Sequence, residues 1–472
     1  MAGLLQLPND VLLIIGEQLE NHGDRWNLVL VSRHFHDLFL SLLYRTARLN
    51  NWHNAYSFLC AITKRPSLAR AARDLDFRDW QAERIAHEDW KMLQRSTTFT
   101  DLVTLESFSW KETAHWKEDL AKGRGDAWLA LMLPFLSQLR RLHLVYSTPT
   151  SCLSRIMQRA INGQRPFQSK PALQHLHEVY LYHQEDPDQP TTQDDSEQGS
   201  NSALLRPFFR LPSIRSIIAH SVIDPTPDNL ESDAGEAEQW PSGISSITEI
   251  DLRRSSGNRG MEALIASCAN LKLFKYQHSD SHLASHGYQP TAFYRSLTRS
   301  KRTLQALWLD HYGDHHPFTS AGLNQTHDKW FGSLADFSAL RELRIRLPNL
   351  LDIRFQSEPT TLLVNCLPGS LESLYIEGCE ERHVGMLVSQ LQAVVKNRRS
   401  RFPHLRYLDV EGAFQNASAN EHDDTSASVS DPSDHTIKPK IMQAAEPLHE
   451  DCASAGLELH IHDRAFSKYS RD

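Results

Sequence analysis

A short pattern of apolar positions, apolar-x-x-apolar-x-apolar, recurs along most of the chain. Its second half alternates apolar and polar residues, as a β-strand with one buried face does. The copies follow one another at an average spacing of about 33 residues, which is typical of a repeat protein. Clear copies are ARDLDF (72–77), LRRLHL (139–144), LHEVYL (176–181), ITEIDL (247–252), LQALWL (304–309), LRELRI (340–345), LESLYI (371–376), LRYLDV (405–410) and LELHI (457–461). Poorer copies are LVTLESF (102–108), IRSIIA (214–219) and LKLFKY (271–276).

Between the copies lie stretches with the apolar spacing of a helix, such as 123–138 and 381–397. In the second of these we expect one apolar face to pack on the sheet, formed by Met386, Leu387, Leu391 and Val394 or Val395. A strand, a return helix and a parallel strand at a fixed period predict a solenoid whose units bury their faces against their neighbours.

The copy LESLYIEGC shows the repeat most completely, and the ninth position of the unit is Ser147, Ser255, Ser279 or Cys379 in four copies. The unit resembles the leucine-rich repeat. That resemblance implies an irregular α/β solenoid with parallel strands on the concave face. The long period further implies full helices on the convex face and insertions. A doubly wound α/β enzyme is the competing architecture, but neither GxGxxG nor GxxxxGK[ST] follows any predicted strand.

Residues 4–43 have a different pattern, which predicts three short helices. Pro8 and Asp10 suit a helix start, and Asp24 can cap the second helix. Val11, Leu12, Ile15 and Leu19 form one apolar stripe, and Leu28, Val31, Phe35, Leu38 and Leu42 form another. Three short helices cannot bury this much apolar surface by themselves, so some of it should meet a partner.

This stretch resembles the F-box, through the Leu7-Pro8 start, Asp10, the Ile15/Leu19 spacing and the VSRHF block at 31–35. Trp26 departs from the family, which more often has a small or aliphatic residue there. The resemblance implies docking on the Skp-type linker subunit of a cullin–RING ubiquitin ligase. The residues expected to bind that subunit are Leu7, Pro8, Val11, Leu12, Ile15, Leu28, Val31, Phe35 and Leu38. The plainer alternative is a helical hairpin that closes the end of a larger domain.

The predicted organisation is therefore an F-box at 1–47, a linker helix at 48–71 and a leucine-rich-repeat-like solenoid at 72–472. Tyr56, Leu59 and Ile62 suggest that the linker helix packs the F-box against the first repeats. Insertions near 185–202, 224–243 and 415–447 are acidic and poor in apolar residues, so we expect disordered loops there.

Charge and composition narrow the class of protein. The net charge is −8 and the pI about 6.3, which argues against a nucleic-acid-binding protein. Six cysteines without a CxxC pair indicate a reducing compartment. Neither a signal peptide nor an apolar run long enough to span a bilayer is present, so we expect no membrane association and a cytoplasmic or nuclear location.

Residues suited to chemistry are common in the chain but poorly organised. Among 25 histidines, His278, His282 and His286 have helical spacing, and His311, His315 and His316 follow near another strand end. Two imidazoles one helical turn apart can share zinc, but the surrounding residues look like a loop, so we expect no metal and no cofactor. GxSxG, HExxH and paired Cys/His motifs are absent from the sequence, which gives no support for catalysis.

These features together predict a non-enzymatic substrate receptor of a cullin–RING ubiquitin ligase, with the target protein bound by the repeats. The alternatives are a scaffold that binds the linker subunit without recruiting the ligase, and an enzyme formed by the repeat array. Strand side chains that alternate with the buried positions should line the concave face. A basic track of Arg253, Lys275, Trp308, Arg344 and Arg346 is expected there, suited to an acidic or phosphorylated target segment.

Overall fold

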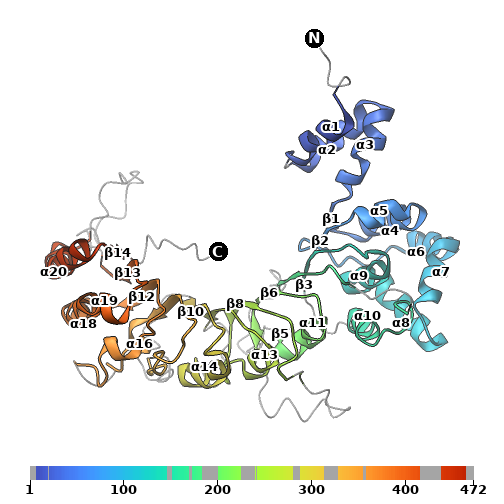
Figure 1. Ribbon diagram of the computed structural model, residues 1–472. Coiled ribbons are helices and arrows are strands. Elements are labelled where there is room, and N and C mark those ends of the chain that lie inside the picture. The colour runs from blue at the N-terminus through green and yellow to red at the C-terminus, as the bar shows by residue number, and fades with distance from the viewer. Residues whose placement is uncertain are drawn as a thin grey trace, which may run out of the picture. The chain divides into compact units, whose positions relative to one another are not determined.

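A computed structural model describes residues 7–19, 21–145, 151–168, 173–182, 200–224, 240, 242–279, 288–312, 328–353, 358–414 and 437–463. It is a mixed α/β structure in which twelve parallel strands follow one another in the order β1-β2-β3-β4-β6-β8-β9-β10-β11-β12-β13-β14 (Figure 1). The chain divides into two compact units. The first contains β1 to β4 and β6 with their helices, and the second contains β5 and every strand from β7 onward.

The first unit begins with three helices, α1 (Asn9–Glu17), α2 (His22–Val31) and α3 (Arg33–Leu43). Asn21 caps α2 by accepting from the Gly23 N–H, so the predicted cap Asp24 lies instead in the first turn. Ser32 ends α2 and caps α3 by accepting from the Phe35 N–H. A small core of their own holds the helices together, formed by Leu12, Val29, Phe35, Phe39 and Leu43.

Residues 48–71 do not form a single linker helix. The chain enters the sheet at β1 (Thr46–Arg48), which pairs in parallel with β2 (Asp74–Phe77). Between them lie α4 (Trp52–Lys64) and α5 (Pro66–Ala71), with Leu59 and Ile62 buried. The predicted linker is thus the first strand–helix repeat. The sequence pattern missed it because β1 has three residues, too few to show an alternating pattern.

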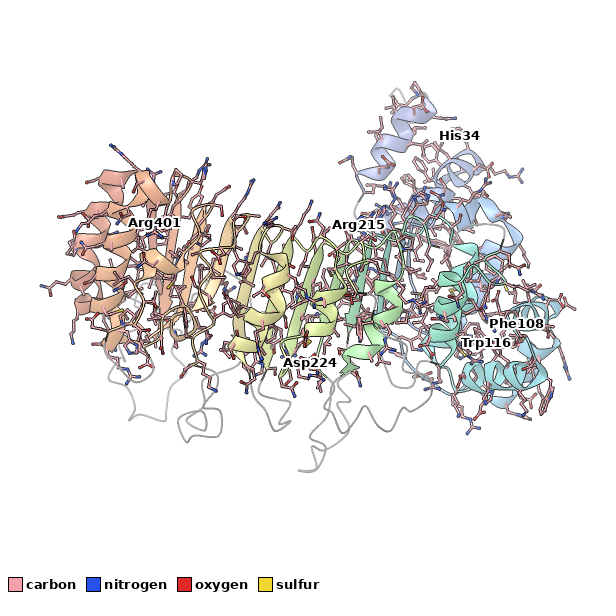
Figure 2. All side chains as sticks on the ribbon, turned by 60° about the horizontal axis from the view of Figure 1, so that its bottom comes forward. His34, Phe108, Trp116, Arg215, Asp224 and Arg401 are labelled. Atoms are coloured by element: carbon pink, nitrogen blue, oxygen red, sulfur yellow. The ribbon has the colours of Figure 1, made fainter. Side chains whose placement is uncertain are left out.

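A group of helices separates β2 from β3: α6 (His87–Arg95), α7 (Thr97–Leu105), α8 (Trp110–Ala121), α9 (Gly125–Met132) and the 3₁₀ turn η2 (Leu133–Phe135). The copy predicted as a strand at 102–108 was wrong, because α7 covers most of it. Phe99, Trp116 and Trp128 are fully buried among these helices, and Trp116 is marked in Figure 2. The unit continues with β3 (Arg141–Val145), α10 (Ser151–Ile161), β4 (Glu178–Tyr182), η3 (Ser202–Leu205), α11 (Arg206–Phe209) and β6 (Ser216–His220).

The second unit repeats a strand and a short helix more regularly. Its strands are β5 (Ser200–Asn201), β7 (Val222–Ile223), β8 (Glu249–Ser255), β9 (Leu273–Ser279), β10 (Ala306–Tyr312), β11 (Glu342–Arg346), β12 (Ser373–Cys379), β13 (Tyr407–Gly412) and β14 (Glu458–Asp463). Its helices are α13 (Glu262–Ser267), α14 (Pro290–Leu297), η4 (Thr298–Ser300), α16 (Leu347–Leu350), α17 (Leu363–Cys366), η5 (Glu381–His383), α18 (Val384–Lys396), α19 (Arg398–Arg401) and α20 (Pro439–Ala455). The helices follow one another along one side of the strands (Figure 1).

Apolar side chains at matched positions of neighbouring strands form the core. Leu75, Leu142, Val179 and Ile217 are register partners in the first unit. Ile250, Phe274, Leu307, Leu343, Leu374 and Leu408 are the equivalent partners in the second. All ten are buried. The predicted helix at 381–397 is confirmed as α18, with Leu387, Leu391, Val394 and Val395 buried and Met386 half-buried.

The predicted disordered insertions fall mostly outside the described residues, namely at 185–199, 225–239 and 415–436. At their edges the prediction was wrong. Residues 439–447 begin α20, in which Ile441, Ala445, Leu448 and Cys452 are buried along one face. Residues 200–202 form β5 and start η3. Among the described helices, none is both long and apolar enough to cross a bilayer.

Candidate interaction surfaces

The three N-terminal helices leave large apolar side chains exposed to solvent. On α1, Val11, Ile14 and Ile15 lie on one face at helical spacing and are 38–59% exposed. On α2, Trp26 and Leu30 are one turn apart and are 50% and 64% exposed. Leu7 and Val31 are exposed as well. Scattered apolar residues on a surface need no explanation, but such stripes on two short helices are typical of a protein-binding surface.

The nine residues predicted to bind the linker subunit divide into two groups. Five are exposed: Leu7, Pro8, Val11, Ile15 and Val31. The other four belong to the core of the three helices, with Leu12 and Phe35 buried and Leu28 and Leu38 partly buried against them. Sequence reasoning missed Ile14, Trp26 and Leu30, although each completes an exposed stripe at spacings of three or four residues.

The second candidate surface is the polar strand face, defined as the side of the sheet whose side chains alternate with the buried apolar row. In the second unit, Lys275, Trp308, Arg344, Tyr375, Asp409 and His460 are register partners on successive strands from β9 to β14. The ammonium of Lys275 lies 3.7 Å from the centre of the Trp308 ring, and Arg344 stands over the Tyr375 ring at 5.0 Å. This row of register partners therefore places cations against aromatic rings of neighbouring strands.

The predicted basic track lies on this face, but its three arginines are paired with acidic residues of the chain. Arg344 is buried and pairs with the equally buried Glu377 at 3.1 Å. Arg346 is buried and pairs with Asp328 at 3.1 Å, and Arg253 lies 3.3 Å from Asp251. The sequence did not reveal the partners of Arg344 and Arg346, because Glu377 lies on the next strand and Asp328 in a loop. Arg344 and Arg346 therefore serve the packing of the face and are poorly placed to attract a ligand.

The polar strand face of the first unit is aromatic. His143 stacks on Tyr180 with ring centres 4.1 Å apart, and Tyr182 stacks on His220 at 5.1 Å. The guanidinium of Arg78 lies 5.7 Å from the Tyr182 ring centre. All four rings are half-buried, so each still presents surface to solvent. Tyrosine and arginine in such a setting are common in binding surfaces.

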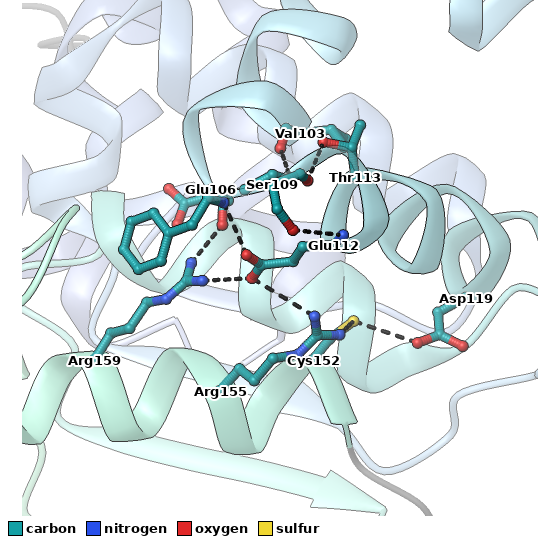
Figure 3. A network of polar contacts seen from close by, with 11 residues as sticks. Val103, Glu106, Ser109, Glu112, Thr113, Asp119, Cys152, Arg155 and Arg159 are labelled. Carbon is teal, nitrogen blue, oxygen red and sulfur yellow. Dashed lines mark hydrogen bonds and ion pairs between the residues drawn. The ribbon is translucent and has the colours of Figure 1, made fainter.

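A buried polar network ties α7, α8 and α10 together in the first unit (Figure 3). Arg159 donates to the backbone carbonyl of Glu106 and to the Glu112 carboxylate, and Arg155 lies 3.5 Å from Glu112. Ser109 accepts from the Glu112 N–H and so caps α8. Both carboxylate oxygens of Glu106 are buried without a hydrogen-bond partner among the described residues, and burial raises the pKa of Glu106 to about 7.

Other buried groups have structural explanations. Burial raises the pKa of the Asp224 carboxyl to about 6, but Asp224 accepts from the N–H groups of Arg259 and Met261 at 3.0 Å and so fixes the turn before α13. Burial raises the pKa of the Cys152 and Cys268 thiols to about 12, which keeps them protonated at neutral pH.

Of the histidines at 278, 282 and 286, which have helical spacing in the sequence, the structure places only His278, and it lies on a strand. His278 is buried in strand β9 and shares a hydrogen bond with the Tyr276 hydroxyl. His282, His286, His315 and His316 lie outside the described residues. A different group comes together instead in the second unit: the donor atoms of Asp409, His460 and His462 all lie within 4.8 Å of one another. The spacing of His460 and His462 on one strand was a local signal, but their meeting with Asp409 depends on the pairing of β13 with β14.

One comparison with known proteins identifies the repeat. A protein-family model described as a leucine-rich repeat domain matches residues 53–429, which is most of the chain. Its start at residue 53 falls in α4, inside the segment predicted as a linker. No curated protein matches the chain. The family indicates a role in protein–protein interaction.

Proposed function

The chain belongs to the leucine-rich repeat domain family, and we propose that it is a non-catalytic substrate receptor of a cullin–RING ubiquitin ligase. Helices α1–α3 dock on the Skp-type linker subunit, which brings in the cullin and RING subunits. The repeats hold a target protein. Binding places target lysines close to activated ubiquitin, so the contribution of this chain is proximity, and the chemistry belongs to other subunits.

The observation that carries the proposal is the exposed apolar surface of α1 and α2. The three helices already have a core, formed by Leu12, Val29, Phe35, Phe39 and Leu43, and the exposed apolar residues lie outside it. The order of Leu7-Pro8, Asp10 and the 31–35 block resembles the F-box. A helical module with surplus apolar surface ahead of a repeat array suits an adaptor that joins two proteins.

The test is calorimetric titration of the full chain with a purified Skp-type linker subunit. Replacing Leu7 and Pro8 together with alanine should weaken binding by about 2 kcal/mol or more, since truncated interface anchors have such costs. Both side chains are exposed, so the helices should stay folded. The matched control is Gln18→Ala, an exposed polar residue next to α1, which should bind as the parent chain does. Unchanged binding in the double variant would contradict F-box docking.

A scaffold that binds the linker subunit without ligase recruitment is the alternative. Purification of the complex from cells separates the two, because a ligase receptor brings cullin and RING subunits with it. A variant that lacks α1–α3 but keeps β1, residues 45–472, should lose those subunits and keep the target. Recovery of the linker subunit alone by the intact chain would favour the scaffold.

For the target-binding surface, the aromatic face of the first unit is a better candidate than the predicted basic track. Tyr180 and Tyr182 keep surface free, whereas Arg344 and Arg346 are buried in ion pairs. Tyr182→Ala should weaken target capture from cells and leave linker binding unchanged. Trp308 and Lys275, which remain half-buried on the second unit, are the next residues to substitute.

A further inference from the structure

The last two strands of the second unit bring two imidazoles and a carboxylate to one point. His460 and His462 are two residues apart on β14, so both side chains lie on the same face. Asp409 is the register partner of His460 on β13. Its carboxylate Oδ1 lies 3.3 Å from Nδ1 of His460 and 3.1 Å from Nε2 of His462. Strand pairing alone thus fixes the three donors relative to one another.

These separations match the edge of a small coordination polyhedron. Zinc binds imidazole nitrogen and carboxylate oxygen at about 2.0–2.2 Å, and two donors of a tetrahedral site are then about 3.3–3.5 Å apart. The third separation, between the two histidine nitrogens, is within 4.8 Å. A modest rotation of one ring would bring all three donor atoms to coordination distance from one ion. Three protein ligands leave one position for water.

Hydrogen bonding accounts for only one of the two imidazoles. Nε2 of His462 is in hydrogen-bonding geometry with the Asp409 carboxylate. Nδ1 of His460 is not, and this nitrogen is buried without a hydrogen-bond partner among the described residues. An orphaned nitrogen facing a carboxylate costs free energy unless something lies between them. A metal ion would satisfy both atoms.

Local charge also favours a cation. Asp409 is 3% exposed, and Glu411, two residues on, is buried as well. Glu411 accepts from the Tyr375 hydroxyl, and the nearby Glu377 takes Arg344 as its partner. Within the described residues, the polar partners of the Asp409 carboxylate are the two imidazoles. A buried carboxylate needs compensation, and a bound divalent cation would supply it.

We infer that Asp409, His460 and His462 form a binding site for a zinc-type divalent ion, which joins β14 to β13 at the end of the repeat array. Two imidazoles and one carboxylate suit zinc and its neighbours in the first transition row, and they suit magnesium poorly. This site is independent of the proposed function, since neither linker docking nor target capture enters the argument.

The experiment measures zinc binding to the full chain by calorimetry, with magnesium as the comparison ion. One equivalent of zinc should bind and magnesium should not. His460→Gln removes one ligand from a partly exposed position and should weaken the affinity for zinc at least about 100-fold, beyond the effect of losing an outer-shell partner. The matched control is His404→Gln, an exposed histidine before β13, which should bind zinc as the parent chain does.

Cobalt supplies a second readout that does not depend on affinity alone. Cobalt bound to this site should give the visible absorption of a four-coordinate ion, and the Asp409→Asn chain should lose that absorption. Circular dichroism checks that each variant is folded. Zinc binding of equal strength in the parent chain, His460→Gln and Asp409→Asn, or a folded parent chain that binds no zinc, would overturn the inference.

Discussion

In α1–α3 large apolar side chains stay in contact with solvent, whereas on the polar strand face of the second unit charged side chains are withdrawn from it. Leu30 and Val31 are 64% and 63% exposed, while Arg344 and Glu377 are 5% and 4% exposed. Residue type alone predicts the opposite in each place. Contact with a partner would remove an exposed apolar side chain from water and so stabilise the complex. The two charges of a buried ion pair already interact with each other inside the chain. The comparison therefore supports the proposal that the helices dock on a partner, whereas the ion pairs of the strand face hold neighbouring strands together.

The largest effect should follow from reversing a buried charge. Arg344→Glu would face Glu377 across neighbouring strands with no water to screen the repulsion, so we expect a loss of about 3–5 kcal/mol in the free energy of unfolding. The control is Arg341→Glu, on the same segment, whose pair with Glu372 is largely exposed. That change should cost less than about 1 kcal/mol. Denaturant unfolding measures both, and similar values for the two would refute the cohesive role of Arg344.

The second effect tests the core of α1–α3. Phe35 is buried, and its ring makes an edge contact with Phe39 at a centroid distance of 5.3 Å. Phe35→Ala should cost about 3–5 kcal/mol locally, because a cavity replaces the ring. Amide hydrogen exchange should report faster opening of α1–α3 with little change in β9–β13. Unchanged protection in the three helices would show that Phe35 is not part of their core.

The strand pattern was readable from the sequence because each repeat must bury the same row of apolar residues. The same reasoning failed at 102–108, where the apolar residues also fit the helical stripe of Phe99, Leu102 and Val103. Ser96, which caps α7, was the signal that could have decided between the two. In α20 the stripe of Ile441, Ala445 and Leu448 was visible too, but the acidic composition before it suggested a loop.

Contacts between strands could not be read from one sequence. The charges of Arg344 and Glu377 meet because their strands are neighbours in a given register, and a one-residue shift would separate them. Asp409 and His460 are likewise brought together only by the pairing of β13 with β14. On α1 and α2 the local spacing sufficed to find apolar stripes, but which stripe faces the core depends on how the helices pack.

The third effect is a dependence of stability on pH in the helices between β2 and β3. Glu106 has a pKa of about 7 in the folded chain against 4.5 as a free side chain, because burial disfavours its charged form. The folded state therefore holds the proton more tightly, so the contribution of Glu106 to stability is fully present below about pH 4.5 and is lost as the pH rises through 7. Asp126, with a pKa raised to about 6 by burial, acts in the same direction.

Glu106→Gln removes that dependence, since the amide never ionises. Denaturant unfolding at pH 5 and pH 8 measures the free energy of unfolding of both chains. The difference between variant and parent chain should shift in favour of the variant by up to about 3 kcal/mol from pH 5 to pH 8. The control is Glu88→Gln in α6, an exposed residue whose substitution should change neither value appreciably. A variant with the same pH slope as the parent chain would show that Glu106 is not the group responsible.

The smallest effect on stability should come from the residues that the comparison assigns to docking. Leu30 and Val31 follow the buried Val29 directly, so three neighbouring apolar residues differ mainly in exposure. Replacing Leu30 and Val31 with serine should alter the free energy of unfolding by no more than about 0.5 kcal/mol, because both side chains already lie in water. Val29→Ser should destabilise the helices clearly, since it puts a hydroxyl into their core. Amide hydrogen exchange of α2 measures the stability of the helices in both variants. If the Leu30/Val31 variant lost as much protection as Val29→Ser, the exposed side chains would be holding the helices together and would not be free to bind a partner.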